Sequence, residues 1–184
     1  MKDAIGGIEI SSIAQGYEVA DAMMKAADVE LLMNQTLCPG KLMLLIGGSN
    51  SSVQSALEAG VAKGGGFIAD KVIIGNIHPE VINVLKRAKQ PLPSSAVGVI
   101  EAFTAVGAIE AADIMVKGSN IELIKINMLI GIGGKGIVTV MGDIASVNMA
   151  VEMAYTQLRS RNVMVNKAII SNPDLEILKH KKPQ

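Results

Sequence analysis

The sequence predicts an α+β protein made of two tandem copies of one βαββαβ unit, residues 1–90 and 91–184. Three observations predict this class: residues of the first half recur in the second half, each half alternates β-rich and helical segments, and a stretch with Pro and Ser separates the halves. Such a unit forms a four-stranded antiparallel sheet with both helices on one face, the ferredoxin-like arrangement.

The repeat is visible in three pairs of segments at one spacing of 92 positions (101 − 9). The matched segments, first copy against second, are 5–9 with 97–101, 18–25 with 110–117, and 28–32 with 120–124. From Lys41, which matches Lys135, the spacing is 94 (135 − 41), so the second copy has gained two residues before this point. Insertions are tolerated in loops, and we therefore expect a loop at residues 129–134.

The first half of each unit is predicted from residue patterns in the first copy. Residues 5–11 alternate and are rich in β-formers, which predicts a strand, and residues 16–27 place apolar side chains on one helical stripe. Two further strands, 30–37 and 41–47, are predicted as a hairpin because Cys38-Pro39-Gly40 between them supplies turn-forming residues.

The remaining elements follow from capping and breaking residues. Residues 49–52 are predicted to cap a second helix, and residues 71–75 form a buried strand. A short helix begins at His78-Pro79-Glu80 with proline in its first turn, and the Pro- and Ser-containing residues 88–95 link the copies. The second copy is expected to repeat this order at 97–103, 108–118, 121–129, 136–141, 144–158 and 163–170.

Composition excludes several classes of protein. Apolar residues make up 49% of the 184 residues, yet no apolar run reaches the ~18–20 residues of a membrane helix. Residues 1–5 lead into a strand without the pattern of a signal peptide, so we expect a cytoplasmic protein. One cysteine rules out an internal disulfide, and zero net charge with scattered Lys and Arg argues against nucleic-acid binding.

Residues 20–31 (ADAMMKAADVEL) and 98–101 (GVIE) resemble the shell-domain family of bacterial microcompartments. The resemblance covers nearly the whole chain, twice, with the strand order unpermuted. It implies a flat tile of a cytoplasmic compartment's shell, and a chain with two fused domains implies a pseudohexameric homotrimer. The implied partners are other shell proteins and redox enzymes inside the compartment, and the chain itself is not expected to be an enzyme.

Residues 36–41 (TLCPGK) resemble a tandem-domain subtype first described in propanediol-utilising compartments. The resemblance implies that Cys38 of three chains meets at the threefold axis and holds a 4Fe–4S cluster, with Leu37, Pro39 and Gly40 lining the pore. It also implies electron transfer across the shell or delivery of iron–sulfur units. Spacing alone favours a simpler interpretation, in which a lone cysteine beside an apolar residue is a small buried side chain.

Residues 131–136 satisfy the G-x-G-x-x-G pattern of dinucleotide-binding proteins. That pattern requires a helix to follow, whereas residues 137–141 (IVTVM) are predicted to form a strand. We therefore interpret this loop as the second copy's contribution to the pore. The expected lining residues are Ile130, Gly131, Ile132, Gly133 and Gly134.

Lys25 and Lys117 follow the helical stripes and are either solvated or, as the resemblance implies, lateral contacts between neighbouring tiles. The family's usual Pro-Arg-Pro-His-like edge segment is replaced by residues 76–79 (NIHP) and 171–173 (SNP). His78 is predicted to be a capping or surface residue, and His180 a solvated residue of the tail.

Two other functions stay open on the sequence alone. One is a shell pore that conducts metabolites without a cluster. The other is a regulator that binds a small molecule between two ferredoxin-like domains. No combination of Ser, His and Asp, or of Cys and His, at matching repeat positions indicates a catalytic triad.

Overall fold

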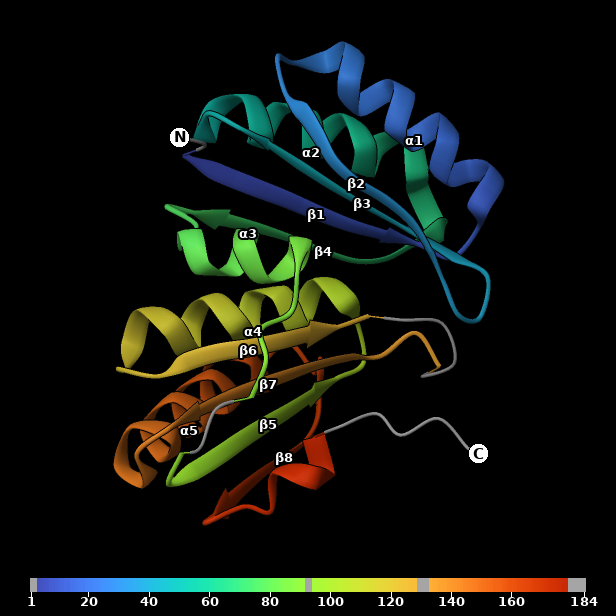
Figure 1. Ribbon diagram of the computed structural model, residues 1–184. Coiled ribbons are helices and arrows are strands. Elements are labelled where there is room, and N and C mark those ends of the chain that lie inside the picture. Colours follow the sequence, from blue (N-terminus) through green and yellow to red (C-terminus); the bar gives the residue numbers. More distant parts are fainter. Residues whose placement is uncertain (1–2, 92–93, 129–132, 179–184) are drawn as a thin grey trace.

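The computed structural model describes residues 3–91, 94–128 and 133–178 (Figure 1). Its strands are β1 (Ala4–Ile10), β2 (Glu30–Leu37), β3 (Lys41–Gly48), β4 (Ile68–Gly75), β5 (Ala96–Ala102), β6 (Glu122–Asn127), β7 (Gly136–Gly142) and β8 (Met164–Ser171). Its helices are α1 (Ile13–Ala26), α2 (Asn50–Gly64), α3 (Pro79–Lys86), α4 (Ala105–Gly118) and α5 (Ile144–Arg159), with short 3-10 turns η1 (Gly65–Phe67) and η2 (Leu175–Leu178). In the described residues, no helix is long and apolar enough to cross a membrane.

The two copies fold as the repeat predicts. The first sheet has the strand order β2-β3-β1-β4 and the second β6-β7-β5-β8, and every neighbouring pair is antiparallel. Helices α1 and α2 pack together on one face of the first sheet, where Ile8, Leu44, Val19 and Met23 form a core. Strand β4 ends at Gly75 and β5 begins at Ala96, with α3 between them.

Two helices begin three residues before their predicted starts, because the caps precede the apolar stripes. The Ser12 hydroxyl accepts a hydrogen bond from the Gln15 N–H at 3.3 Å, and the Thr104 hydroxyl accepts one from the Gly107 N–H at 3.1 Å. Each cap satisfies an amide that the helix leaves without an internal partner. Strand β4 likewise begins at Ile68 rather than residue 71, and β6 ends at Asn127 rather than residue 129.

The second face of the first sheet is also covered, which the sequence patterns do not reveal. Helix α4 of the second copy lies across the outer side of β1 and β4 (Figure 1). The approach is close at Gly7, where an added Cβ would lie 2.8 Å from a Val106 methyl group. One hydrophobic core therefore runs from the outer face of the first sheet through α4 into the second copy.

Candidate functional site

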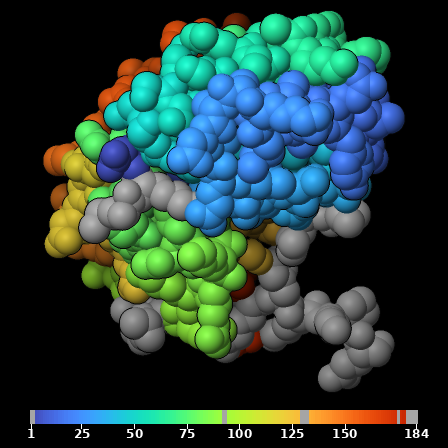
Figure 2. All heavy atoms as spheres, turned by 90° about the horizontal axis from the view of Figure 1, so that it is seen from above, coloured from blue at the N-terminus to red at the C-terminus, as the bar shows by residue number. Residues whose placement is uncertain are grey.

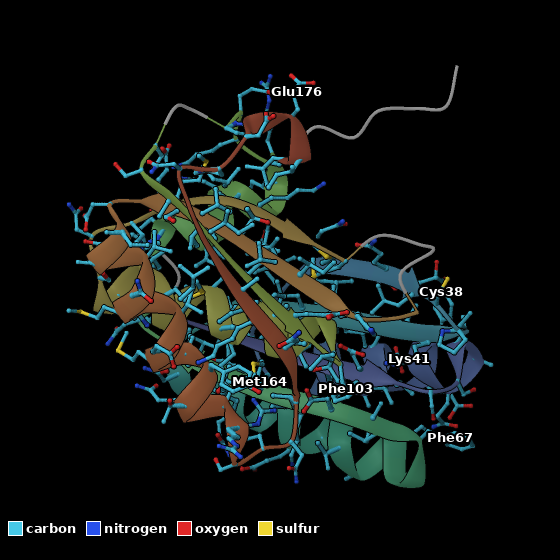
Figure 3. All side chains as sticks on the ribbon, turned by 90° about the horizontal axis from the view of Figure 1, so that it is seen from below. Cys38, Lys41, Phe67, Phe103, Met164 and Glu176 are labelled. Carbon is cyan, nitrogen blue, oxygen red and sulfur yellow. The ribbon has the colours of Figure 1, made fainter. Side chains whose placement is uncertain are left out.

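Cys38 lies at the turn that joins β2 to β3, as the sequence predicts. Leu37 before it is buried, Cys38 is half-buried, and Pro39 and Gly40 are exposed. Gly40 has a φ of 81°, which glycine adopts more readily than any other residue. Figure 3 shows Cys38 near the end of this hairpin, with Lys41 at the start of the returning strand. The thiol is thus carried on a surface turn rather than in the core.

The glycine loop of the second copy contacts this turn directly. A Cβ added to Gly134 would lie 2.0 Å from the carbonyl oxygen of Cys38, so only glycine fits there. The loop predicted to line the pore with the Cys38 turn therefore meets it within one chain. Three other residues of that prediction, Ile130, Gly131 and Ile132, lie outside the described residues.

The described part of one chain supplies a single thiol, and no cluster of other metal ligands accompanies it. Within residues 3–91, 94–128 and 133–178, no group of three or more His, Cys, Asp or Glu side chains could hold a metal ion. Iron–sulfur clusters are typically held by several cysteine thiolates. Cys38 fits such a cluster only where a symmetry axis brings several chains together, and a half-buried turn can present it in that way.

A buried carboxylate, Glu9, joins the two copies near this turn. Its side chain is fully buried on β1, one oxygen accepts the Val106 N–H at 3.0 Å, and the other pairs with the Lys41 ammonium at 3.0 Å. The N-terminus of α4 favours negative charge. Desolvation nevertheless dominates and raises the pKa of Glu9, against the opposing effects of Val106 and Lys41.

Glu9→Gln is expected to change how stability depends on pH. Since the native pKa of Glu9 is raised, folding favours its protonated form, so its contribution is fully present below the ordinary value of 4.5 and is lost as pH rises through the native pKa. The stability of the natural chain relative to the variant should therefore fall as pH rises from 4.5. Denaturant unfolding of both proteins across this range measures it, and a constant difference would contradict the assignment.

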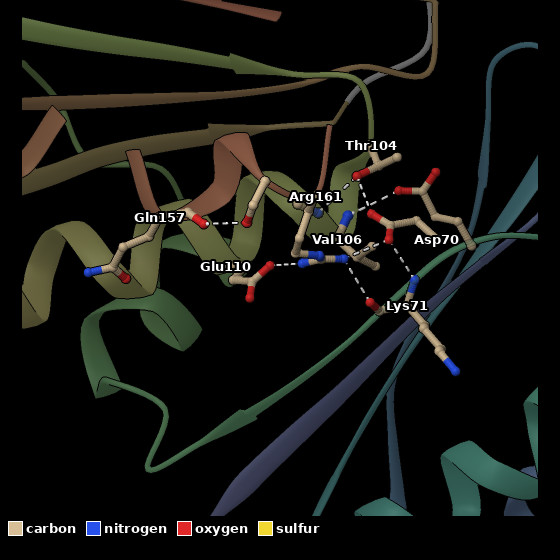
Figure 4. A network of polar contacts seen from close by, with 10 residues as sticks. Asp70, Lys71, Thr104, Val106, Glu110, Gln157 and Arg161 are labelled. Carbon is tan, nitrogen blue, oxygen red and sulfur yellow. Dashed lines mark hydrogen bonds and ion pairs between the residues drawn. The ribbon is translucent and has the colours of Figure 1, made fainter. Parts of the chain in front are cut away.

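A second polar network ties the segment after α5 to α4 and β4 (Figure 4). The Arg161 guanidinium donates to an Asp70 carboxylate oxygen at 2.7 Å and to the Lys71 carbonyl at 2.9 Å, and it also pairs with Glu110. The other Asp70 oxygen accepts the Thr104 hydroxyl at 2.6 Å. These charges are paired across the junction of the copies, which fixes the orientation of one copy relative to the other.

The remaining predicted residues occupy different environments. The Lys117 ammonium donates to the Gly75 carbonyl at 3.0 Å and pairs with Asp113, so it joins the two copies, whereas exposed Lys25 pairs with Asp21 at 2.7 Å. A lateral role for either lysine between tiles stays a prediction. His78 is the N-cap of α3 and accepts the Glu80 N–H at 3.3 Å, which confirms its expected capping role. His180 lies outside the described residues.

Neither Glu9 nor Arg161 was predicted from the sequence as a functional residue. A signal for Glu9 was present, because the matched segments IGGIE and VGVIE place a glutamate at the same point of an otherwise apolar strand in both copies. A carboxylate retained there indicates a partner shared by both copies. Arg161 lies in an inter-element connection and has no such signal.

Comparison with known proteins gives matches over both copies. A family model described as BMC domain matches residues 4–77 and again residues 96–173. The bacterial microcompartment shell protein PduT of Citrobacter freundii is 38% identical over 173 residues, which is 94% of each chain. The major carboxysome shell protein CsoS1A of Halothiobacillus neapolitanus is 37% identical over 91 residues, 47% of this chain and 92% of its own.

Solved structures agree with this pattern. A microcompartments protein from Desulfitobacterium hafniense DCB has a TM-score of 0.83 at 38% identity, covering 97% of this chain and 99% of its own. The fused permuted hexameric shell protein MSM0275 from the RMM microcompartment has a TM-score of 0.68 at 21% identity, covering 86% of this chain and 84% of its own. The second likeness concerns the fold alone.

Proposed function

The chain belongs to the BMC-domain family of bacterial microcompartment shell proteins, and from this premise we propose that three copies close into one cyclic tile of the shell. One observation carries the proposal. The contact between the two copies inside the chain has a second, matching pair of surfaces: α1, which one chain leaves largely exposed, and the outer face of the second sheet, where Val99 and Glu101 are only partly buried. Repeating the internal contact between chains gives a closed ring of six similar units.

The surface that one chain leaves exposed is clearest on α1, the counterpart of α4. Nine residues of α4 are buried, but only three of α1, its counterpart in the first copy. Ile109 of α4 is fully buried in the core that both copies share, whereas Tyr17, at the matching position 92 residues earlier (109 − 17), is 60% exposed. Large exposed apolar surfaces commonly mark interfaces. The partner surface for α1 is the outer face of the second sheet.

That outer face carries the same charged pair as the first. Glu101 on β5 pairs with Lys135 at 2.7 Å, just as Glu9 pairs with Lys41. The N-terminus of a neighbouring chain's α1 would therefore meet Glu101 as the N-terminus of α4 meets Glu9. Its Ala14 N–H is the counterpart of the Val106 N–H that Glu9 accepts.

Side-chain sizes at the two contacts are complementary. Inside the chain, Gly7 on the sheet faces Val106 on α4. At the matching positions of the contact between chains, the sheet has Val99 and the helix has Ala14. The larger side chain lies on the helix in the contact inside the chain and on the sheet in the contact between chains. Each contact therefore holds one large and one small side chain. Close packing favours such volume-conserving exchanges.

The same ring would bring three Cys38 turns around the axis, and we extend the proposal to a shared 4Fe–4S cluster. The support is that the only cysteine of the chain lies half-buried on a turn whose backbone packs against Gly134 of the loop predicted to line the pore. Three thiolates would hold the cluster, with its fourth iron left to a ligand other than cysteine. Such a cluster supplies one-electron transfer, which in a shell permits electron passage or iron–sulfur delivery to enclosed enzymes.

A second candidate is the same tile with an inert Cys38 and a pore that passes metabolites. It is favoured by the finding that, among the described residues, no three or more His, Cys, Asp or Glu side chains are grouped so that they could hold a metal ion. The regulator hypothesis has less support, because α4 packs against the first sheet where a ligand between the domains would bind. The two shell hypotheses assume the same trimer and differ only in whether the sulfur of Cys38 binds iron.

Cys38→Ser separates the two shell candidates. We expect the anaerobically purified natural trimer to show the visible absorption and EPR signals of an iron–sulfur cluster, and the serine variant to lose both. Because serine is similar in size and lies on a surface turn, native mass spectrometry should still give a trimer. An unchanged EPR signal in the variant would refute the cluster, and a monomeric natural protein would refute the tile itself.

A further inference from the structure

The segment after β8 repeats the start of α3 at a spacing of 96 positions (176 − 80). In α3, His78 accepts the N–H of Glu80 at 3.3 Å. In η2, the Asp174 carboxylate accepts the N–H of Glu176 at 2.9 Å. Register supports the same spacing, because Gly75 and Ser171 pair with the matching residues Ala4 and Ala96. The tail therefore begins as a second, shorter version of α3.

Inside the chain, α3 and the residues after it close the edge of the neighbouring sheet. A Glu80 carboxylate oxygen accepts the N–H of Leu123 on edge strand β6 at 3.1 Å, and the Lys89 N–H donates to the carbonyl of Ile124 at 2.8 Å. The apolar side chains beside this contact, Val81 and Leu123, are both fully buried. Each edge of this kind needs such cover, because open strands otherwise pair with other chains.

The first copy presents the same edge without this cover. Strands β2 and β6 have the same register shift, between Leu31 and Met33 and between Leu123 and Lys125, so Leu31 is presented as Leu123 is. Yet Leu31 is 37% exposed. Beside it, β2 and α3 line a mainly apolar groove of about 550 Å³. Figure 2 shows the light-blue atoms of β2 next to the green atoms of α3 on the molecular surface.

The matching cover is η2, but it cannot reach β2 of its own chain. Figure 1 places η2 beside β8 at one end of the molecule and β2 at the other, and Figure 3 shows Glu176 far from Cys38 at the end of β2. Ile177, the counterpart of Val81, is 58% exposed. Leu31 on β2 and Ile177 on η2 are thus both exposed, whereas their counterparts Leu123 and Val81 are fully buried.

We propose that η2 of one chain docks on β2 of the next copy, with Ile177 packing on Leu31 and the Glu176 carboxylate accepting the Leu31 N–H. The inference rests on the proposed cyclic trimer and adds a contact to it: the tail acts as a clasp between adjacent subunits. The partner is a second copy of this chain, because the geometry repeats the contact of α3 with β6. The clasp completes the edge strand that a single chain leaves uncovered.

Cross-linking tests the clasp separately from the trimer. In a Cys38→Ser background, Leu31→Cys combined with Ile177→Cys should give covalently joined subunits when treated with a short bismaleimide. Leu31→Cys combined with Met149→Cys is the matched control, because Met149 is also 58% exposed but lies on α5. A native trimer whose two cysteine pairs cross-link equally poorly would overturn the clasp and leave the tile intact. A monomer would overturn both.

Amide exchange tests the hydrogen bond itself. Leu31 should exchange slowly in the assembled trimer, and Glu176→Ala should speed its exchange about tenfold, the effect expected from losing one hydrogen bond to a charged group. Glu58→Ala, an exposed glutamate on α2, provides the control. Equal exchange at Leu31 in both variants, with the trimer present, would overturn the role of Glu176.

Discussion

Ala14→Asp is expected to leave the chain folded and to convert the trimer into monomers. Ala14 is exposed in the single chain and lies in the first turn of α1, where an acidic side chain stabilises a helix by about 0.3–1 kcal/mol. In the proposed ring the new carboxylate would face Glu101 of the adjacent chain. The counterpart of Glu101, Glu9, is fully buried, so the added charge would be desolvated beside a like charge.

The expected penalty is about 3–5 kcal/mol for each of these contacts, the cost of an uncompensated buried charge. That corresponds to an association constant weaker by roughly 10²- to 4 × 10³-fold for each contact. Native mass spectrometry and sedimentation at micromolar concentration measure it. Ala145→Asp makes the same change at the second residue of α5, which is exposed as Ala14 is, and should leave the trimer intact. A trimer that survives Ala14→Asp would show that α1 is not the interface.

The fold could be predicted from the sequence because the two copies supply independent evidence for one pattern. Apolar stripes, turn residues and prolines are local signals, and each strand and helix was found within a few residues. The errors at two strand ends and two helix starts were two or three residues long. At the helices the reason is that Ser12 and Thr104 cap them before the apolar stripes begin. A helix cap depends on one side chain and one amide, so its signal in the sequence is weaker than that of an apolar stripe several residues long.

The contact between the copies could not be predicted in the same way. Val106 meets Glu9, and Arg161 meets Asp70, across separations of 97 and 91 residues along the chain. No periodicity indicates which elements from different copies approach one another. Apolar α4 did carry a hint, because a helix buried on most of its surface must have neighbours on more than one side.

The Cys38 turn was predicted, but its contact with Gly134 of the second copy was not. Local residues suffice to place a hairpin turn at Cys38-Pro39-Gly40. The contact of this turn with Gly134 depends on how the second copy is placed against the first. The sequence marked the glycine loop as part of the pore through its match to the first copy, without indicating that the two loops touch inside one chain.

Gly134→Ala is therefore expected to damage both stability and the position of Cys38. Gly134 has a φ of 74°, which costs an alanine about 1–2 kcal/mol. The new Cβ would also lie 2.0 Å from the Cys38 carbonyl oxygen, a backbone atom that must move. Overpacking of this kind adds about 1–3 kcal/mol, so the total loss should be about 2–5 kcal/mol. The displaced turn should also hold less iron per trimer.

Gly133→Ala is the control that separates backbone strain from collision. Gly133 has a similar φ of 66°, and no atom in the described part of the chain lies within 4 Å of a Cβ there. This variant should lose about 1–2 kcal/mol and keep its iron. Urea unfolding and iron content of both anaerobically purified proteins provide the comparison. Equal losses of stability and iron in the two variants would mean that Gly134 is needed only for its positive φ. The Cys38 turn would then keep its position without contact from the second copy.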